Sequence, residues 1–181
     1  MKKANNHTVN IASSNSHDTL TSLFKELTDD TDFKKKQNAR NTLVKMGKSI
    51  IPDLHKLLNS KSVLIRKEAA KVVQIIADIR SIPVLINLLD DTEFDIRWIA
   101  SEGLIRIGRR SIMPLLKTIC VRKSSLFLDR GAHQILSRLL YENEKEKFMP
   151  LMLSLDNYHE LGEIAPAEAS KLLKAKFRLK D

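Results

Sequence analysis

Residues 64–107 read LIRKEAAKVVQIIADIRSIPVLINLLDDTEFDIRWIASEGLIRI, and this stretch repeats itself. Arg66, which follows an isoleucine, recurs as Arg97, and 97 − 66 = 31. Pro83 recurs at the same interval as Pro114. A fixed period in this range indicates a chain built from stacked supersecondary units.

Each repeat predicts two helices. From residue 64 to residue 77 the apolar side chains recur every three or four positions, which is the spacing of one stripe along an α-helix. The members of this stripe are Ile65, Ala69, Val72, Val73 and Ile76. A second, shorter stripe follows over residues 82–89, with Pro83 in its first turn, where a missing N–H costs nothing. One such pair cannot bury both stripes, so neighbouring pairs must stack.

The order of these features resembles HEAT-like repeat proteins, of the short-repeat type found in phycobilisome-lyase-like sequences. Each unit has a proline-led helix with paired leucines, an acidic turn, Ile-Arg, a small residue and an apolar run. The resemblance covers roughly residues 19–155. It implies a hydrogen-bonded ladder between units, made by an Asp in the turn and an Arg six residues later. The ladder positions are Asp91 with Arg97, Ser60 with Arg66, and Asp30 with Lys36.

We therefore predict an all-α fold, a right-handed α-solenoid (superhelix) of about five antiparallel helix pairs with a period near 31 residues. Residues 1–16 are polar and without apolar period, and we predict a disordered tail. Residues 17–181 form the HEAT-like repeat domain, with units at 17–47, 49–77, 81–108, 110–140 and 145–179. In the last unit, a proline-led helix is expected from Phe148 and a final helix from Pro166.

The net charge is +9 and the sequence pI is about 9.7. This excess favours an anionic partner, which is nucleic acid, an acidic protein or a membrane surface. The alternative is a charge that only keeps the protein monodisperse. The lone Cys120 excludes an intrachain disulfide, and it lies in an apolar run typical of a buried thiol. No apolar run is long enough to span a membrane, so we expect a cytoplasmic protein.

The resemblance implies that the Ile-Arg helices line the concave side of the stack. The residues that we expect to face outward from this layer and bind a partner are Arg40, Lys67, Lys71, Trp98, Glu102, Arg130 and His133. Trp98 lies off the apolar stripe, which suits a binding hot spot or base stacking. The alternative is a Trp98 side chain that packs against the neighbouring helix.

Two basic clusters are candidates for binding anions. They consist of Lys34, Lys35 and Lys36 near the N-terminus and of Lys171, Lys174, Lys176 and Arg178 at the C-terminus. Such clusters can grip phosphate. The first is equally explained as a solvated face, and the second as a helix cap whose charges suit the helix dipole.

No catalytic residue, metal ligand or cofactor is predicted. Di-iron hydroxylases related to this family carry paired His-Glu motifs, whereas the only His-Glu here is His159-Glu160, which lies in an irregular segment and has no partner motif. Glycine-rich phosphate loops and the motifs of hydrolases and zinc proteases are absent from the sequence.

The function that this pattern favours is a non-catalytic adaptor or scaffold that binds a protein or peptide on its concave face. The first alternative is a HEAT-like protein that binds the phosphate backbone of nucleic acid. The second is an accessory subunit or lyase-like factor for a pigment or protein-modification system. Nothing in the sequence indicates an oligomeric state.

Overall fold

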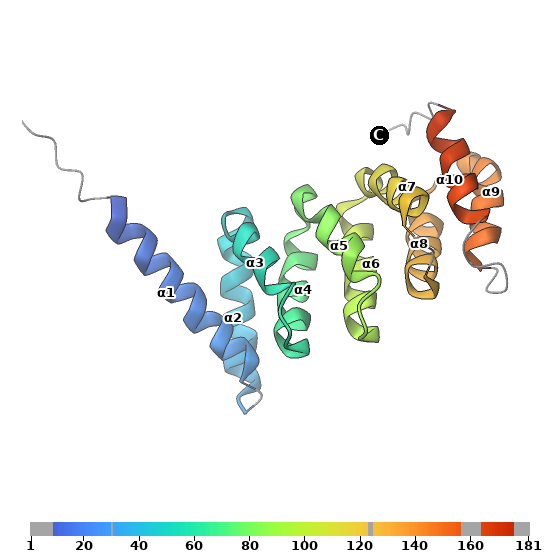
Figure 1. Ribbon diagram of the computed structural model, residues 1–181. Helices are drawn as coiled ribbons and strands as arrows, with labels where there is room; N and C mark the ends of the chain where they lie inside the picture. The colour runs from blue at the N-terminus through green and yellow to red at the C-terminus, as the bar shows by residue number, and fades with distance from the viewer. Residues whose placement is uncertain (1–8, 30, 123–124, 157–163, 176–181) are drawn as a thin grey trace, which may run out of the picture. The chain divides into compact units, whose positions relative to one another are not determined.

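The computed structural model describes residues 9–29, 31–122, 125–156 and 164–175, with side chains from Thr19 onward. These residues form α-helices and short 3-10 turns, and no strand occurs within these ranges. The chain divides into two compact units, an N-terminal unit up to Ile50 and a C-terminal unit from Ile51 (Figure 1). The predicted all-α class is confirmed.

The N-terminal unit contains one helix pair. Its elements are α1 (Val9–Thr28), α2 (Phe33–Met46) and the 3-10 turn η1 (Gly47–Ile50). Asp32 caps α2 by accepting a hydrogen bond from the Lys35 backbone N–H at 2.9 Å. Gly47 ends α2 at a φ of 63°, which favours glycine. Leu27 and Leu43 are fully buried where the two helices pack together.

The first helix begins earlier than predicted. We expected a disordered tail to residue 16 and a helix from His17, but α1 starts at Val9. The tail contains no glycine or proline. Serine, asparagine and valine are weak helix formers, but a helix that has already formed gains one hydrogen bond with each added residue and needs no new nucleus. Residues 1–8 lie outside the described residues.

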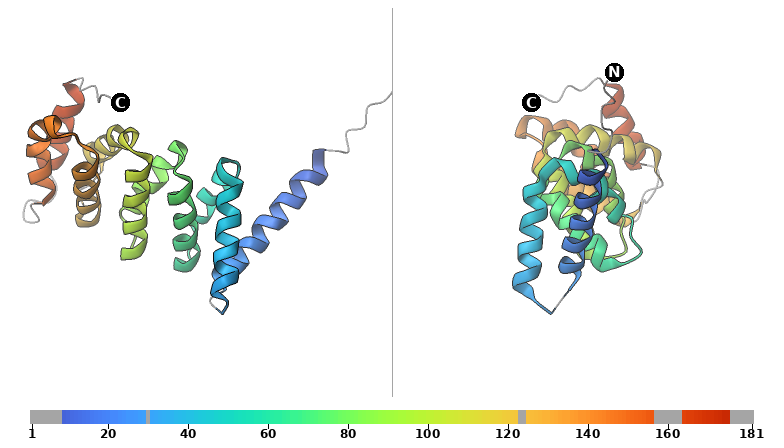
Figure 2. Two further views of the ribbon diagram at one scale, coloured as in Figure 1. Left: turned by 180° about the vertical axis from the view of Figure 1, so that it is seen from behind. Right: turned by 90° about the vertical axis from the view of Figure 1, so that its left-hand side faces the viewer.

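The C-terminal unit stacks four helix pairs. Its elements are α3 (Ile51–Leu57), α4 (Val63–Ile76), η2 (Ile79–Ser81), α5 (Ile82–Leu88), α6 (Phe94–Ile107), η3 (Arg109–Ser111), α7 (Ile112–Val121), α8 (Leu126–Leu139), α9 (Glu142–Asp156) and α10 (Ile164–Lys174). Helices α4, α6 and α8 lie side by side, and the shorter α5 packs on both α6 and α7 (Figures 1 and 2). This stacking of neighbouring pairs is the packing of a HEAT-like solenoid.

The predicted stripes form the core of this unit. Ala69, Val72 and Val73 are completely buried, and so are Leu54 and Leu85 of the proline-led helices. A glycine permits the closest approach. A Cβ on Gly131 of α8 would lie 3.0 Å from Leu89 and 3.4 Å from the Ser101 hydroxyl of α6. The tight fit between α6 and α8 therefore depends on that missing side chain.

The last pair differs from the prediction. Helix α9 begins at Glu142, so Pro150 lies inside it and does not lead it. The run Glu142–Lys147 consists mainly of strong helix formers. Pro150 has no N–H to donate to the backbone carbonyl group four residues earlier, but Pro150 is exposed, so water can bind that carbonyl group instead.

The two helices of the last pair also exchange layers. Helix α9 packs on α8, the helix of the Ile-Arg layer, and α10 packs on α7, the proline-led helix. The half-buried Cys120 thiol of α7 contacts the Pro166 carbonyl of α10 at 3.7 Å. Terminal repeats are commonly atypical because they cover the end of the stack.

Candidate functional site

An arginine and an aspartate join the second and third helix pairs. The Arg66 guanidinium donates to both carboxylate oxygens of Asp91, from Nε at 2.8 Å and from Nη2 at 3.0 Å. The two side chains are 14% and 7% exposed, so the bidentate pair is largely shielded from water. Burial raises the pKa of Asp91, but the hydrogen bonds from Arg66 and the Glu93 backbone outweigh it and hold this pKa below its usual value.

Each ladder arginine also binds its own turn. Arg66 Nη1 donates to the Ser60 carbonyl oxygen at 2.9 Å. Arg97 Nη1 donates to the equivalent carbonyl oxygen, that of Asp91, at 2.7 Å and to that of Thr92 at 2.8 Å. The ladder thus pairs the Asp91 carboxylate with Arg66 of the preceding helix pair. Arg97, which the resemblance places in one ladder position with Asp91, reaches only the Asp91 backbone.

The ladder lacks its aspartate at the fourth helix pair. The turn before α8 carries no acidic residue from Val121 to Leu126. Arg97 instead lies over the Phe127 ring, with Cζ 3.9 Å from the ring centroid, and it lies 5.8 Å from the centroid of Phe94. A cation–π contact therefore stands where the previous junction has a buried ion pair.

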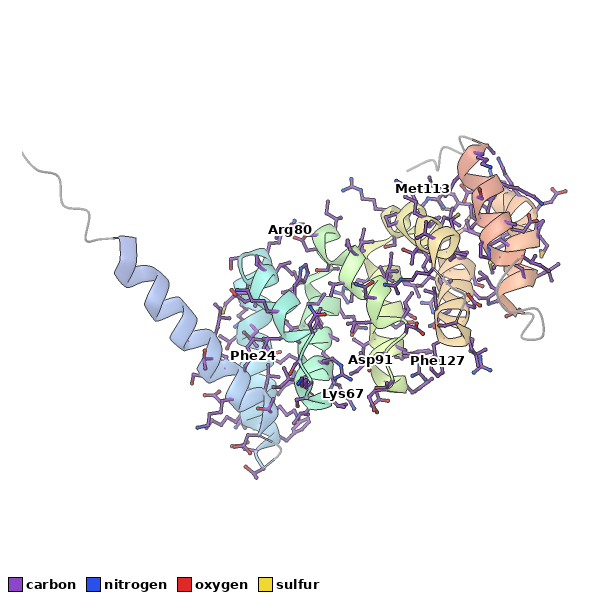
Figure 3. All side chains as sticks on the ribbon, viewed as in Figure 1. Phe24, Lys67, Arg80, Asp91, Met113 and Phe127 are labelled. Atoms are coloured by element: carbon purple, nitrogen blue, oxygen red, sulfur yellow. The ribbon has the colours of Figure 1, made fainter. Side chains whose placement is uncertain are left out.

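Around Arg97 the surface is aromatic. Phe94, Trp98 and Phe127 are 67%, 50% and 40% exposed, and the rings of Phe94 and Trp98 stack with centroids 6.5 Å apart. Together with Arg97 and Arg130 they line a hollow of about 90 Å³, which Ser101 and Gly131 also line. We call these five residues (Phe94, Arg97, Trp98, Phe127 and Arg130) the aromatic–arginine surface. Figure 3 shows Phe127 and Asp91 at the same edge of the C-terminal unit, with Arg80 and Met113 at the opposite edge.

The predicted lysines of this layer are engaged within the protein. Lys67 of α4 forms an ion pair with Asp95 of α6, which joins neighbouring helix pairs. Lys71 donates to the carboxylate of Glu68 at 2.8 Å, and Glu68 is buried. Because both lysines already have carboxylate partners, they offer an acidic ligand less than their sequence positions indicate.

Two further predicted residues connect helices. Glu102 accepts a hydrogen bond from Gln134 at 3.2 Å, which links α6 to α8. His133 Nε2 lies 3.3 Å from a carboxylate oxygen of Asp156, which links α8 to α9. His133 and Asp156 border a mostly apolar groove of about 320 Å³ that also exposes Met149. These residues lie beside the aromatic–arginine surface or beyond it, not within it.

The other predicted residues lie apart. Arg40 belongs to the N-terminal unit, where its Nη1 donates to Gln37 at 3.1 Å. Lys34 and Lys35 are exposed at the start of α2, and Lys36 is half-buried. On α10, Lys171 pairs with Glu168 at 2.5 Å and Lys174 is exposed. Three predicted residues lie outside the described residues, namely Asp30, Lys176 and Arg178.

A second buried ion pair was not predicted. Arg109 donates to both carboxylate oxygens of Glu144, at 2.9 and 2.6 Å, and stacks on Tyr141 with Cζ 4.0 Å from the ring centroid. Glu144 also accepts the Tyr141 backbone N–H at 2.9 Å, so it caps the start of α9. Hydrogen bonds from Arg109 lower the pKa of Glu144 more than burial raises it. This pair fastens the last helix pair to the turn before α7.

The described residues offer little for catalysis. Within the described ranges no group of three or more His, Cys, Asp or Glu side chains is placed to hold a metal ion. His55 Nε2 lies 2.9 Å from the buried Ser81 hydroxyl, and burial together with Arg80 lowers the pKa of His55. Ser81 has no exposed surface, so the pair serves to satisfy buried polar atoms. Among the described helices, none is both long and apolar enough to cross a lipid bilayer.

Sequence reasoning singled out Trp98 and Arg130 as contact residues and Arg97 as a ladder residue, but it did not name Phe94 or Phe127. A signal was available. Phe94 stands four residues before Trp98, which places both on one helix face away from the apolar stripe. Phe127 occupies the equivalent face of the next helix of the layer, where an aromatic side chain has no core to fill.

Comparison with known sequences agrees with this architecture. Residues 20–105, which run from α1 into α6, match the family model for HEAT repeats. No protein of curated function matches the chain in sequence. The matched model describes HEAT repeats in general, so the phycobilisome-lyase-like subtype stays a prediction. The repeat match and the stacked helix pairs together support a HEAT-like repeat protein.

Proposed function

We propose that this protein is a non-catalytic, cytoplasmic adaptor that holds a segment of a protein partner on its aromatic–arginine surface. HEAT repeats are generally protein-interaction scaffolds and generally non-catalytic. The proposal adds a location on this chain and a mode of contact.

The observation that carries the proposal is the exposure of three aromatic rings around one hollow. Water-exposed aromatic side chains are costly to keep in a cluster, and such clusters mark binding sites for macromolecules. Tryptophan and arginine are the residue types that most often dominate binding energy. Trp98 and Arg97 are of these types and belong to one helix, α6, so little backbone conformational entropy is lost on binding.

The size of the hollow favours a protein partner over a small molecule. Sites for cofactors and substrates usually enclose about 300 Å³ or more. The hollow at Trp98 has about 90 Å³. It suits the tip of one side chain from a segment that lies across the exposed rings.

The test is capture of partners from native lysate, at low and high salt, with and without nuclease. The protein is compared with Trp98→Ala and with the control Ile79→Ala. Ile79 is also 50% exposed but lies outside the aromatic–arginine surface. We expect a discrete protein partner that survives nuclease and high salt, with affinity lowered about 30-fold by Trp98→Ala. Equal capture by Trp98→Ala and Ile79→Ala would exclude this surface.

Nucleic-acid binding is the second candidate, and the exposure of Lys34 and Lys35 favours it. The two ammonium groups project from the first turn of α2, and the whole chain carries a net charge of +9. Binding through phosphate contacts must weaken steeply as salt rises. Recovery of nucleic acid alone, lost at high salt and in Lys34→Glu/Lys35→Glu but not in Trp98→Ala, would establish this function in place of the first.

A further inference from the structure

The repeat supplies a comparison for Arg97 within the same chain. Arg66 and Arg97 stand 31 residues apart, and each uses Nη1 to bind the carbonyl groups of its own turn. Arg66 uses its remaining edge, Nε and Nη2, to hold the Asp91 carboxylate. In the part of the chain that the structure describes, no acceptor lies against Nε or Nη2 of Arg97.

The surroundings keep this edge of Arg97 available. The Phe127 ring lies against a face of the guanidinium group, and a ring in that position leaves the in-plane N–H groups clear. Arg97 is half-buried beside the 90 Å³ hollow, so a ligand there would meet a guanidinium group that has already lost much of its water. Charge-assisted hydrogen bonds are strongest under these conditions.

We propose that Arg97 binds a carboxylate of the partner segment side-on, as Arg66 binds Asp91 within the chain. The inference rests on the proposed function and specifies the partner. The bound segment carries an Asp or Glu next to an apolar residue, which packs on Trp98 and Phe94. The partner thus supplies the carboxylate that the turn before α8 lacks, and the ladder continues across the interface.

The first test uses acetate as the probe and needs no partner. Sodium acetate is titrated into the ¹⁵N-labelled protein against sodium chloride at constant ionic strength, and the arginine Nε–H resonances are followed by NMR. We expect a saturable shift for Arg97 and none for Arg66, whose Nε already donates to Asp91. An Arg97 resonance that moves equally in both salts would overturn the proposal. So would a larger effect of methyl phosphate than of acetate, because that result assigns the site to phosphate.

The second test uses peptides in matched pairs. An array carries octapeptides with a central Asp or Glu beside each apolar residue, and each peptide is also present with the corresponding Asn or Gln. We expect the protein to prefer acidic members by on the order of tenfold. Arg97→Lys keeps the positive charge but loses the two parallel N–H donors of the guanidinium group, so it should abolish the preference for acidic peptides. The control is Arg106→Lys, at an exposed arginine of the same helix, and it should leave the preference for acidic peptides unchanged.

The outcomes separate this inference from the proposed function. Binding that depends on Trp98 but is equal for acidic and amide peptides overturns the carboxylate assignment and leaves the adaptor function standing. A preference for acidic peptides that persists in Arg97→Lys also overturns the assignment of the carboxylate to Arg97 and leaves the adaptor function standing. If no peptide binds and acetate leaves Arg97 unmoved, the inference fails, while the adaptor function is judged separately by the effect of Trp98→Ala on capture from lysate.

Discussion

Loss of the Asp91 charge should destabilise the junction between the second and third helix pairs. In Asp91→Asn the shape of the side chain is kept, but Arg66 loses its counter-ion. The Arg66 side chain is only 14% exposed, so water replaces the lost interaction poorly. Removing one partner of a buried ion pair costs about 3–5 kcal/mol, and a hydrogen bond to a charged group contributes about 1.5–3 kcal/mol.

The expected loss lies at the lower end of these ranges. Arg66 keeps its hydrogen bonds to the Ser60 and Lys61 carbonyl groups, and the pair lies at an edge of the unit rather than in its centre. We expect Asp91→Asn to lower the free energy of unfolding by about 2–3 kcal/mol. For a chain of this size that corresponds to a Tm lower by about 5–10 °C.

The assay is urea unfolding followed by circular dichroism, in a double-mutant cycle of Asp91→Asn with Arg66→Met. Urea is chosen because guanidinium salts screen ion pairs. The coupling energy should be at least about 1.5 kcal/mol. The control is Glu142→Gln, which breaks an exposed pair with Lys145 and should change stability by less than about 0.5 kcal/mol. A coupling energy no larger than the effect of the control would refute the reasoning.

Three further predictions concern pH, packing and reactivity. The pKa values of Asp91 and Glu144 are lowered by folding, so their stabilisation is present above the unfolded values of 3.8 and 4.5 and disappears as pH falls through the lower folded values. The urea midpoint should therefore fall in acid, and less so in Asp91→Asn. Gly131→Ala forces a methyl group against Leu89 and should cost about 1 kcal/mol in urea unfolding, despite the better helix propensity of alanine. Burial raises the pKa of Cys120, so maleimide should alkylate the folded protein at least about tenfold more slowly than the urea-unfolded chain at neutral pH.

The middle of the fold could be predicted because its signals agree with one another. Pro83 and the leucine pairs mark the short helices, while the 3.6-residue stripe ending at Ile76 marks the long ones. Helices α3 to α8 accordingly lie within the predicted repeat units 49–77, 81–108 and 110–140. Where local propensity and repeat pattern disagreed, propensity prevailed. The run from Glu142, which consists mainly of strong helix formers, formed helix through Pro150.

The site was less predictable because its contacts join distant positions. The family resemblance implies a ladder position at Asp91 and Arg97, six residues apart, whereas the Asp91 carboxylate binds Arg66, 25 residues earlier. Arg109 and Glu144 are 35 residues apart, and no local motif relates them. Pairings between repeats depend on how the helices stack, and a single sequence determines that stacking only through the whole fold.

Trp98 gives this protein an intrinsic optical reporter. It is the only tryptophan of the chain and is half exposed, so the indole emission arises from a single position, on the surface where we propose that the partner binds. A ligand that covers the ring should shift the emission to shorter wavelength, whereas binding elsewhere should leave the spectrum unchanged. Affinity at this surface can thus be followed on the unlabelled protein, and the place of contact is known before the partner is.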